Sequence, residues 1–237
     1  MVAGELRREG WRVNLKRVYR LWRREGLKVA RKARKQRAKG GSENSCVNRP
    51  AKHKDDIWAM DFIHDSTASG NSLKILVVED EFTRECLALE VGGGRFSGER
   101  VADVLTELFA IRGVPNGLRS DNGGEFIGTA VSGRLKAAGA QALPVEAGCP
   151  WENGVVESLN SILRDELLNT ELFTTVKAAR EMATAWRLEY NHRRPHGALG
   201  YQAPAEYASR CQPAPGSATL RPTLPGSGKM DKAMVLS

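Results

Sequence analysis

The sequence is poor in cysteine and in long apolar runs. Its four cysteines, among 237 residues, form no Cys-x-x-Cys pair and stand at Cys46, Cys86, Cys149 and Cys211. This spacing argues against a disulfide framework and against a structural zinc site. The best apolar run, Leu73 to Val78, has the length of a strand, whereas a membrane span needs about 18 residues. No apolar stretch follows Met1, as a signal peptide would require. We therefore expect a reduced, cytosolic protein without a membrane segment.

Acidic residues are scarce at the beginning of the chain. Residues 1–39 contain 15 Lys and Arg but only 3 Glu, whereas residues 40–237 contain 21 basic and 25 acidic residues. A basic arm on a mildly acidic body is typical of nucleic-acid-binding proteins, because clustered cations attract phosphates. The alternative is a charged, solvated helix or tail without a partner. The excess of basic residues favours a nucleic-acid partner.

The basic arm is predicted to contain a helix. Asn14 is a suitable N-cap for a helix from Leu15 to about Glu25, and Gly26 is a suitable stop. Residues 5–9 are expected to end a preceding helix. The apolar stripe of the predicted helix consists of Leu15, Val18 and Trp22. Basic side chains lie off this stripe, so the helix presents an apolar side and a basic side.

The chain divides into five segments by composition. From residue 31 to about residue 55 it is basic and then rich in Gly, Ser and Asn without a period, which indicates a linker. The region from about residue 212 is rich in Pro, Gly and Ser, and we expect it to be disordered. The predicted segments are a basic arm over 1–39, a linker over 40–55, an α/β core over 56–170, a helix with a basic loop over 171–210, and a tail over 211–237.

The core is predicted to be an α/β unit. Strands are expected at Ile57–Asp65, Leu73–Asp80, Glu85–Val91, Gly117–Ser120 and Gln141–Val145. Helices are expected from about Val101 to Gly113, at Thr129–Ala138, at Glu152–Asn169, and over a last amphipathic stretch from Val176 to Tyr190. Three adjacent strands followed by alternating helices and strands predict a mixed sheet covered by helices on both faces.

Two aspartates occupy informative positions in this pattern. Asp61 lies within the predicted apolar strand Trp58-Ala-Met-Asp-Phe-Ile63, where a charge is costly unless it is paired or bound to a metal. Asp121 follows a strand end, and strand ends in open α/β sheets are where ligands usually bind. Carboxylates are also the ligands that Mg²⁺ prefers. Both residues are therefore candidate ligands of a catalytic metal.

A third acid lies on the helix that follows the motif Pro150-Trp-Glu-Asn-Gly154. The buried stripe of this helix is predicted to be Val156, Leu159, Leu163 and Leu167. At about 100° per residue, Glu157, Asn160 and Arg164 fall in one sector beside that stripe. One flank of the helix therefore combines an acid, an amide and a guanidinium, which suits a metal ligand with phosphate-binding neighbours.

Each of these residues also has a purely structural interpretation. Asp61 can be a paired core acid, the segment after Asp121 a simple turn, and Glu157 with Arg164 a surface ion pair. The acidic turn Glu79-Asp-Glu81 is expected to be an ordinary solvated hairpin. His192 and His196 can be metal ligands, but we expect a basic loop that faces phosphate.

The combination of motifs resembles the insertion-sequence transposases of the IS-three family, in the retroviral-integrase superfamily. The matching residues are Trp58-Ala-Met-Asp-Phe62, Asp80-Glu-Phe-Thr-Arg84, Ser120-Asp-Asn-Gly123, Pro150-Trp-Glu-Asn-Gly154, Glu157-Ser-Leu-Asn160, Arg164, Tyr190-Asn-His-Arg-Arg-Pro-His196, Leu199-Gly-Tyr201 and Pro204. The 35 residues between Asp121 and Glu157 fit this pattern, and the resemblance covers about residues 1–208. It implies an RNase H-like core in which Asp61, Asp121 and Glu157 are catalytic and bind two Mg²⁺ ions, with Mn²⁺ as a substitute.

The resemblance also implies a reaction and a set of DNA contacts. In the family, water cuts a transposon end to free a 3′-hydroxyl, which then attacks another phosphodiester. The partners would be the terminal inverted repeats and target DNA, in a homo-oligomer on DNA within a bacterial cytoplasm, associated with the nucleoid. The expected DNA-binding residues are Asn160, Arg164, Arg193, Arg194 and His196 in the core, and Lys16, Arg17, Arg20, Arg23 and Arg24 in the arm.

The arm resembles the end of the family's helix-turn-helix region, through Leu15-Lys-Arg-Val-Tyr-Arg-Leu21. We expect a complete recognition unit to be missing, and the helix-turn-helix protein of an upstream reading frame to be a partner. Gly92-Gly-Gly94 departs from the pattern and is expected to loosen the turn after the third strand. Two alternatives remain open: a decayed remnant that binds DNA nonspecifically, and a stand-alone RNase H-like nuclease.

Overall fold

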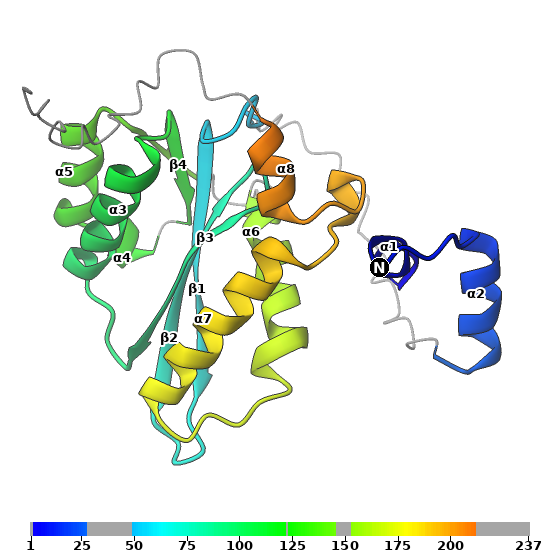
Figure 1. Ribbon diagram of the computed structural model, residues 1–237. Helices are drawn as coiled ribbons and strands as arrows, with labels where there is room; N and C mark the ends of the chain where they lie inside the picture. Colours follow the sequence, from blue (N-terminus) through cyan, green and yellow to red (C-terminus); the bar gives the residue numbers. More distant parts are fainter. Residues whose placement is uncertain (1, 28–48, 122, 146–152, 212–237) are drawn as a thin grey trace, which may run out of the picture.

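A computed structural model of the protein describes residues 2–27, 49–121, 123–145 and 153–211. Its centre is a five-stranded sheet in the order β3-β2-β1-β4-β5 (Figure 1). The strands are β1 (Ile57–Ser66), β2 (Ser72–Asp80), β3 (Cys86–Gly93), β4 (Gly117–Ser120) and β5 (Gln141–Pro144). The first three pair antiparallel, and β4 and β5 run parallel to β1. The predicted mixed sheet is therefore confirmed.

Helices cover both faces of the sheet, as the sequence predicts. On one side lie α3 (Gly98–Arg112), α4 (Gly124–Ile127) and α5 (Thr129–Ala138), and on the other α6 (Gly154–Leu163) and α7 (Val176–His192) (Figure 1). Because side chains alternate along a strand, Trp58 and Met60 of β1 are buried in the α3 and α5 layer. Ala59 and Ile63 are buried in the α6 and α7 layer. The parity of a residue on β1 thus decides which layer it faces.

The helix ends follow the capping residues. Ser97 caps α3 through a hydrogen bond from the Arg100 N–H, and Gly113 ends the helix with φ of 89°. Thr175 caps α7 in the same way, accepting from the Ala178 N–H. Pro204 opens the last helix, α8 (Pro204–Arg210), after the short turn η3 (Gly197–Leu199). These caps account for the boundaries of the helices that flank the sheet.

The helix predicted over residues 152–169 is not a uniform α-helix. After α6 the chain forms one π-helical turn, η2 (Arg164–Leu168). The apolar spacing does not distinguish the two geometries, because Leu163 and Leu167 are buried in either case. Residues 146–152, which include the predicted start of this helix, lie outside the described residues.

The expectation that Gly92-Gly-Gly94 loosens the turn after the third strand does not hold for the first two glycines. Gly92 and Gly93 belong to β3 and pair with Lys74 and Leu73 of β2. A Cβ atom at Gly92 would lie 2.9 Å from the Phe96 ring carbon Cδ2. Glycine is therefore required because the ring packs directly against the strand backbone, and the strand stays regular there.

The basic arm forms two helices, α1 (Val2–Arg8) and α2 (Leu15–Arg24), beside the core (Figure 1). As predicted, Asn14 caps α2, accepting from the Lys16 N–H, and Gly26 follows with φ of 68°. Helix α1 buries Ala3, whereas α2 buries no residue. Most of the predicted linker and the predicted tail lie outside the described residues. No helix in the described part of the chain is long and apolar enough to span a bilayer.

Candidate active site

Asp61 lies at the centre of β1, on the face that α6 covers. It stands between Ala59 and Ile63, which share its face of the strand and are buried there. Its Oδ2 accepts a hydrogen bond of 2.7 Å from Asn160 Nδ2 of α6, and its Oδ1 accepts one of 2.8 Å from the Phe62 N–H. These contacts fix the carboxyl group between the sheet and the helix.

The pKa of the Asp61 carboxyl is raised above its ordinary value. Burial is the main cause, because it penalises the charged form. The negative charges of Asp121 and Glu157 raise the pKa further, while the hydrogen bonds from Phe62 and Asn160 lower it. Asp121 and Glu157 therefore both lie within electrostatic reach of Asp61, although the three acids come from three different elements.

Asp121 directly follows β4 and is exposed. Its Oδ1 accepts a hydrogen bond of 3.0 Å from the Gly123 N–H. A Cβ atom at Gly123 would lie 3.0 Å from this same oxygen, so a side chain there would displace the carboxylate. Asn122 of the motif lies outside the described residues. The glycine of Asp-Asn-Gly is thus explained by its close approach to the acid.

The segment after Asp121 is held against the other face of the sheet. Glu125 forms an ion pair with Lys74 of β2, and the Phe126 ring stacks on Phe62 with ring centroids 4.8 Å apart. Lys74 Nζ also lies 4.2 Å from the centre of the Phe62 ring. Sequence reasoning missed Lys74 and Glu125. The signal was a lysine within an otherwise apolar strand, which needs a partner when it is buried.

Glu157 is exposed on α6, one turn before Asn160. The predicted stripe of this helix is confirmed, since Val156, Leu159 and Leu163 are all buried against the sheet. Arg164 is exposed at the start of the π turn, and its side chain has no hydrogen bond or ion pair with any described residue. The flank therefore runs from an exposed acid, through an amide bound to Asp61, to an exposed guanidinium.

The three acids have no basic counter-charge in the part of the chain that the structure describes. Among the described residues, no Lys, Arg or His forms an ion pair with Asp61, Asp121 or Glu157. Within the same residues, no three His, Cys, Asp or Glu side chains stand close enough together to hold a metal ion as they are. Like-charged carboxylates repel, and Asn160 already occupies one oxygen of Asp61. The acids thus converge without closing on a common point.

The prediction of a solvated hairpin at Glu79-Asp-Glu81 is wrong. These three residues, called here the turn acids, have exposed fractions of 1%, 0% and 8%. Asp80 Oδ2 accepts hydrogen bonds from the hydroxyl and the N–H of Thr83, at 2.6 and 3.1 Å. Glu81 Oε1 lies 2.8 Å from Arg119 Nε of β4. The turn acids are therefore buried within the fold instead of lying in solvent, and Asp80 and Glu81 have partners there.

Burial dominates the titration of the turn acids. It raises the pKa of Asp80 to about 6 and that of Glu81 to about 6, although Thr83 and Arg119 oppose the shift. For Glu79, burial raises the pKa well above its ordinary value. Burial has this effect on all three carboxyls because it penalises their charged forms.

The segment Tyr190–His196 packs on the strand that follows the turn acids. Asn191 of α7 accepts from the Cys86 N–H and donates to the Cys86 carbonyl, both at 2.9 Å. Arg194 Nε lies 2.7 Å from Glu166 Oε1, and His196 is half-buried, with a pKa that burial lowers. Arg193 is exposed and its Nη1 lies 3.4 Å from Glu189 Oε2. Of the three DNA contacts predicted here, Arg193 is the most accessible.

The predicted DNA-binding residues of the arm lie on the exposed surface of α2. They are Lys16, Arg17, Arg20, Arg23 and Arg24. Arg24 Nη2 lies 3.0 Å from Glu25 Oε1, and the Arg23 guanidinium lies 5.8 Å from the centre of the Tyr19 ring. Such exposed contacts are weak and leave both cations accessible to a further partner.

Two family models, both described as integrase core domain, match this chain. One matches residues 51–150 and the other residues 138–204. Together they span the sheet, the three acids and the segment Tyr190–His196. The matched region ends at the beginning of α8.

Proteins of bacterial insertion elements are similar over most of the chain. The insertion element IS407 31.7 kDa protein of Burkholderia multivorans is 38% identical over 203 residues, which are 86% of this chain and 72% of that protein. The InsD protein for insertion element IS2E of Escherichia coli K12 is 31% identical over 82% of this chain and 91% of its own length. Transposase InsD for insertion element IS2D of the same strain has the same identity, over 66% of its length.

Solved structures with a similar fold are retroviral integrases. The simian T-cell lymphotropic virus intasome aligns with 80% of this chain and 63% of its own, at a TM-score of 0.54 and 15% identity. The HTLV-2 integrase catalytic core domain in complex with magnesium aligns with 67% of this chain and 99% of its own, at 0.50 and 13%. At these identities the likeness concerns the fold, which is that of an RNase H-like catalytic core.

Proposed function

Because the chain belongs to the insertion-element transposases that carry an integrase core, we propose that Asp61, Asp121 and Glu157 are its catalytic acids in DNA cleavage and strand transfer. The family membership makes the protein a polynucleotidyl transferase of DNA transposition. One observation supports the assignment of the acids most: Asp61 is half-buried on β1, and the negative charges of Asp121 and Glu157 raise its pKa. Such an arrangement favours the binding of a cation.

The donor set fits divalent magnesium. All three groups are carboxylates, which are the oxygen ligands that Mg²⁺ prefers, and none has a basic partner among the described residues. Bound Mg²⁺ would lower the pKa of the attacking water or hydroxyl and stabilise charge on the leaving oxygen. The solved HTLV-2 integrase core is a complex with magnesium, which supports magnesium as the metal. The proposal is of two Mg²⁺ ions, with Mn²⁺ as a substitute.

The chain's own residues then divide the remaining work. Asn160 orients the Asp61 carboxyl through its 2.7 Å hydrogen bond, and Gly123 leaves room for Asp121. Arg164 would hold a phosphate of the reacting strand. In the first step water attacks a phosphodiester at the transposon end, and the bond from phosphorus to the 3′-oxygen breaks. In the second, the freed 3′-hydroxyl attacks a target phosphodiester and displaces the 3′-oxygen of the target strand.

The arm would supply contacts to the DNA backbone. The basic residues of α2 are exposed and suited to phosphates, which position a protein without reading bases. We expect binding with a steep salt dependence and little preference for transposon ends. The helix-turn-helix protein of an upstream reading frame would add the recognition, in an oligomer on DNA near the bacterial nucleoid.

The test is strand cleavage and strand transfer by the purified chain on a labelled transposon-end duplex with Mg²⁺. We expect both products, and none in EDTA. Mg²⁺ should also raise the Tm, because it binds the folded state. At 100 times its Kd, the gain in the free energy of unfolding is about 2.7 kcal/mol. Binding of DNA without any cleavage would indicate a decayed remnant, and cleavage without strand transfer would indicate a stand-alone nuclease.

A further inference from the structure

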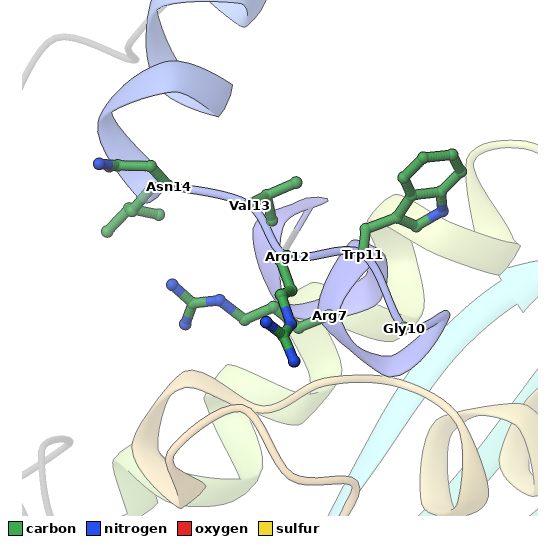
Figure 2. A pocket seen from close by; sticks show the side chains of 7 residues that line it. Arg7, Gly10, Trp11, Arg12, Val13 and Asn14 are labelled. Carbon is green, nitrogen blue, oxygen red and sulfur yellow. The ribbon is translucent and has the colours of Figure 1, made fainter.

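A cavity of about 630 Å³ lies at the turn between α1 and α2, and none of the three candidate acids lines it (Figure 2). It is lined by Arg7 and by residues 10–15. Figure 2 shows the guanidinium groups of Arg7 and Arg12 extended on one side of the turn, whereas the Trp11 indole points to the other side. Two cationic side chains from separate positions of the arm thus share one cavity.

Neither guanidinium has a counter-charge within the part of the chain that the structure describes. Arg7 and Arg12 are exposed, and their side chains form no hydrogen bond or ion pair with these residues. Two like charges that line one cavity repel each other, and a shared anion removes this repulsion. Guanidinium groups bind phosphate through paired N–H donors, so two of them can surround one phosphate group. The cavity therefore has the chemistry of a phosphate site.

The cavity is held at a fixed place beside the core. Arg8, the neighbour of Arg7 on α1, places its Nη2 3.0 Å from Glu206 Oε2 of α8 and its Nη1 against the Arg193 carbonyl. A Cβ atom at Gly4 would lie 3.4 Å from Tyr201 Cβ, which shows how closely α1 packs. Because successive helix residues are about 100° apart, Arg8 faces the core while Arg7 is free for a ligand.

We propose that Arg7 and Arg12 together bind one internucleotide phosphate of DNA, at a position that Arg8 fixes relative to the catalytic core. The proposal rests on the proposed function as a DNA transposase, which supplies the ligand. The neighbouring Trp11, with 62% of its surface exposed, offers an aromatic face beside the phosphate. Helix α2 continues the basic surface from the cavity, so the strand would run from this phosphate along α2.

The salt dependence of binding distinguishes one shared phosphate from two separate ones. Each neutralised phosphate contributes about 0.9 to the slope of log affinity against log salt on duplex DNA. The double variant Arg7→Ala/Arg12→Ala should therefore reduce the slope by about 0.9. A reduction of about 1.8 would indicate two independent phosphate contacts, and an unchanged slope would indicate none. Either result would overturn the proposal.

The measurement uses the full chain and a blunt duplex in EDTA, so that cleavage plays no part. Arg134→Ala is the matched control, because Arg134 is an exposed arginine of α5, on the far side of the sheet (Figure 1). It should leave the slope unchanged. Inorganic phosphate at constant ionic strength should not displace the duplex; displacement that depends on Arg7 would identify a free-phosphate site instead. Loss of cleavage in the catalytic-acid variants is a separate result, so failure of the proposed function remains distinguishable.

The anchor is tested by charge reversal. Arg8→Glu should reduce cleavage per bound duplex severalfold, because it places two acids together and releases α1. The swap Arg8→Glu/Glu206→Arg restores the pair and should restore most of the cleavage. If Arg8→Glu cleaves bound DNA as well as the wild type, the site is not fixed by Arg8 and that part of the proposal fails.

Discussion

Two sets of three acidic residues in this protein differ in their electrostatic surroundings. The turn acids, Glu79–Glu81, are consecutive and buried, and Arg119 of β4 lies 2.8 Å from Glu81. The catalytic candidates come from β1, from the end of β4 and from α6, and no described cation pairs with them. In the first set Arg119 supplies a counter-charge to Glu81, and in the second we propose that a bound metal supplies it.

This difference shows that burial and acidity alone do not mark a site. Both sets contain a carboxyl whose pKa burial raises, Asp61 in one and Asp80 in the other. Perturbed titration is therefore common to a structural network and to a catalytic centre. The distinguishing feature is the partner. Thr83 and Asp55 satisfy Asp80 through hydrogen bonds, whereas Asp61 has an amide and two further acids beside it.

The largest effect is expected from neutralising the catalytic candidates. Asp61→Asn, Asp121→Asn and Glu157→Gln should each reduce Mg²⁺-dependent cleavage to the background of the assay, because each removes a metal-binding charge. Their stability should stay near that of the wild type, since no described cation loses its partner. Asp103→Asn, a change at an exposed acid of α3, is the control. A variant that retained near-normal cleavage would remove its residue from the site.

The opposite pattern is expected when a turn acid loses its partner. Arg119 Nε pairs with Glu81, and its Nη2 donates to the Arg49 carbonyl at 2.7 Å. Arg119→Ala leaves the Glu81 charge buried without its arginine, which typically costs 3–5 kcal/mol, so about that loss is expected in denaturant unfolding. Arg119→Ala/Glu81→Gln should recover part of it. A loss below about 1 kcal/mol would mean that water replaces the arginine.

The pattern of the sequence predicts most of this fold but not the turn acids. Strand alternation and helix caps are local signals, so β1 and the end of α3 at Gly113 follow from residues close in sequence. The pairing of Glu81 does not, because Arg119 of β4 reaches it only after the sheet has formed. The same holds for Gly92, whose need for glycine depends on how the Phe96 ring packs.

The candidate site was predictable for a different reason. The strand around Asp61 and the flank of α6 each restrict their polar residue to one face, so convergence follows from periodicity. What periodicity could not predict is the anchoring of the segment after Asp121. That depends on Lys74, which reaches Glu125 from a strand 51 residues away. The π turn at Arg164–Leu168 could not be predicted from the spacing of apolar residues either, because it preserves the apolar stripe.

A smaller effect concerns pH. Burial raises the pKa of Asp80 and of Glu81 to about 6, from 3.8 and 4.5. The folded state therefore binds their protons more tightly, and their contribution to stability is full below about pH 4 and lost as the pH rises through 6. We expect part of any fall in Tm between pH 5 and pH 7 to disappear in Asp80→Asn and in Glu81→Gln. An unchanged pH profile in both variants would contradict this.

One acid with the opposite shift bounds this pH window. Burial raises the pKa of Asp56, but hydrogen bonds from Asn116 and the Lys52 N–H outweigh it and bring the pKa below 3.8. Its contribution is present above about pH 4 and is lost only on further acidification. Asp56 therefore does not mask the change between pH 5 and pH 7, and Asp103→Asn again serves as the control.

The smallest effect on stability is expected at Arg164, although its effect on cleavage should be large. Arg164 is exposed and has no partner among the described residues, so Arg164→Ala should change the free energy of unfolding by no more than about 0.5 kcal/mol. Because Arg164 lies on the same flank as Glu157 and Asn160, loss of its phosphate contact should reduce cleavage strongly. Arg164→Lys keeps the charge without the paired donors, so its cleavage activity should fall between those of the wild type and Arg164→Ala.

The free energy of unfolding and the cleavage activity are measured on one preparation of each variant, with Arg134→Ala as the control. A large loss of stability with full specific activity would make Arg164 a structural residue. It would then not bind the phosphate of the reacting strand beside the three acids.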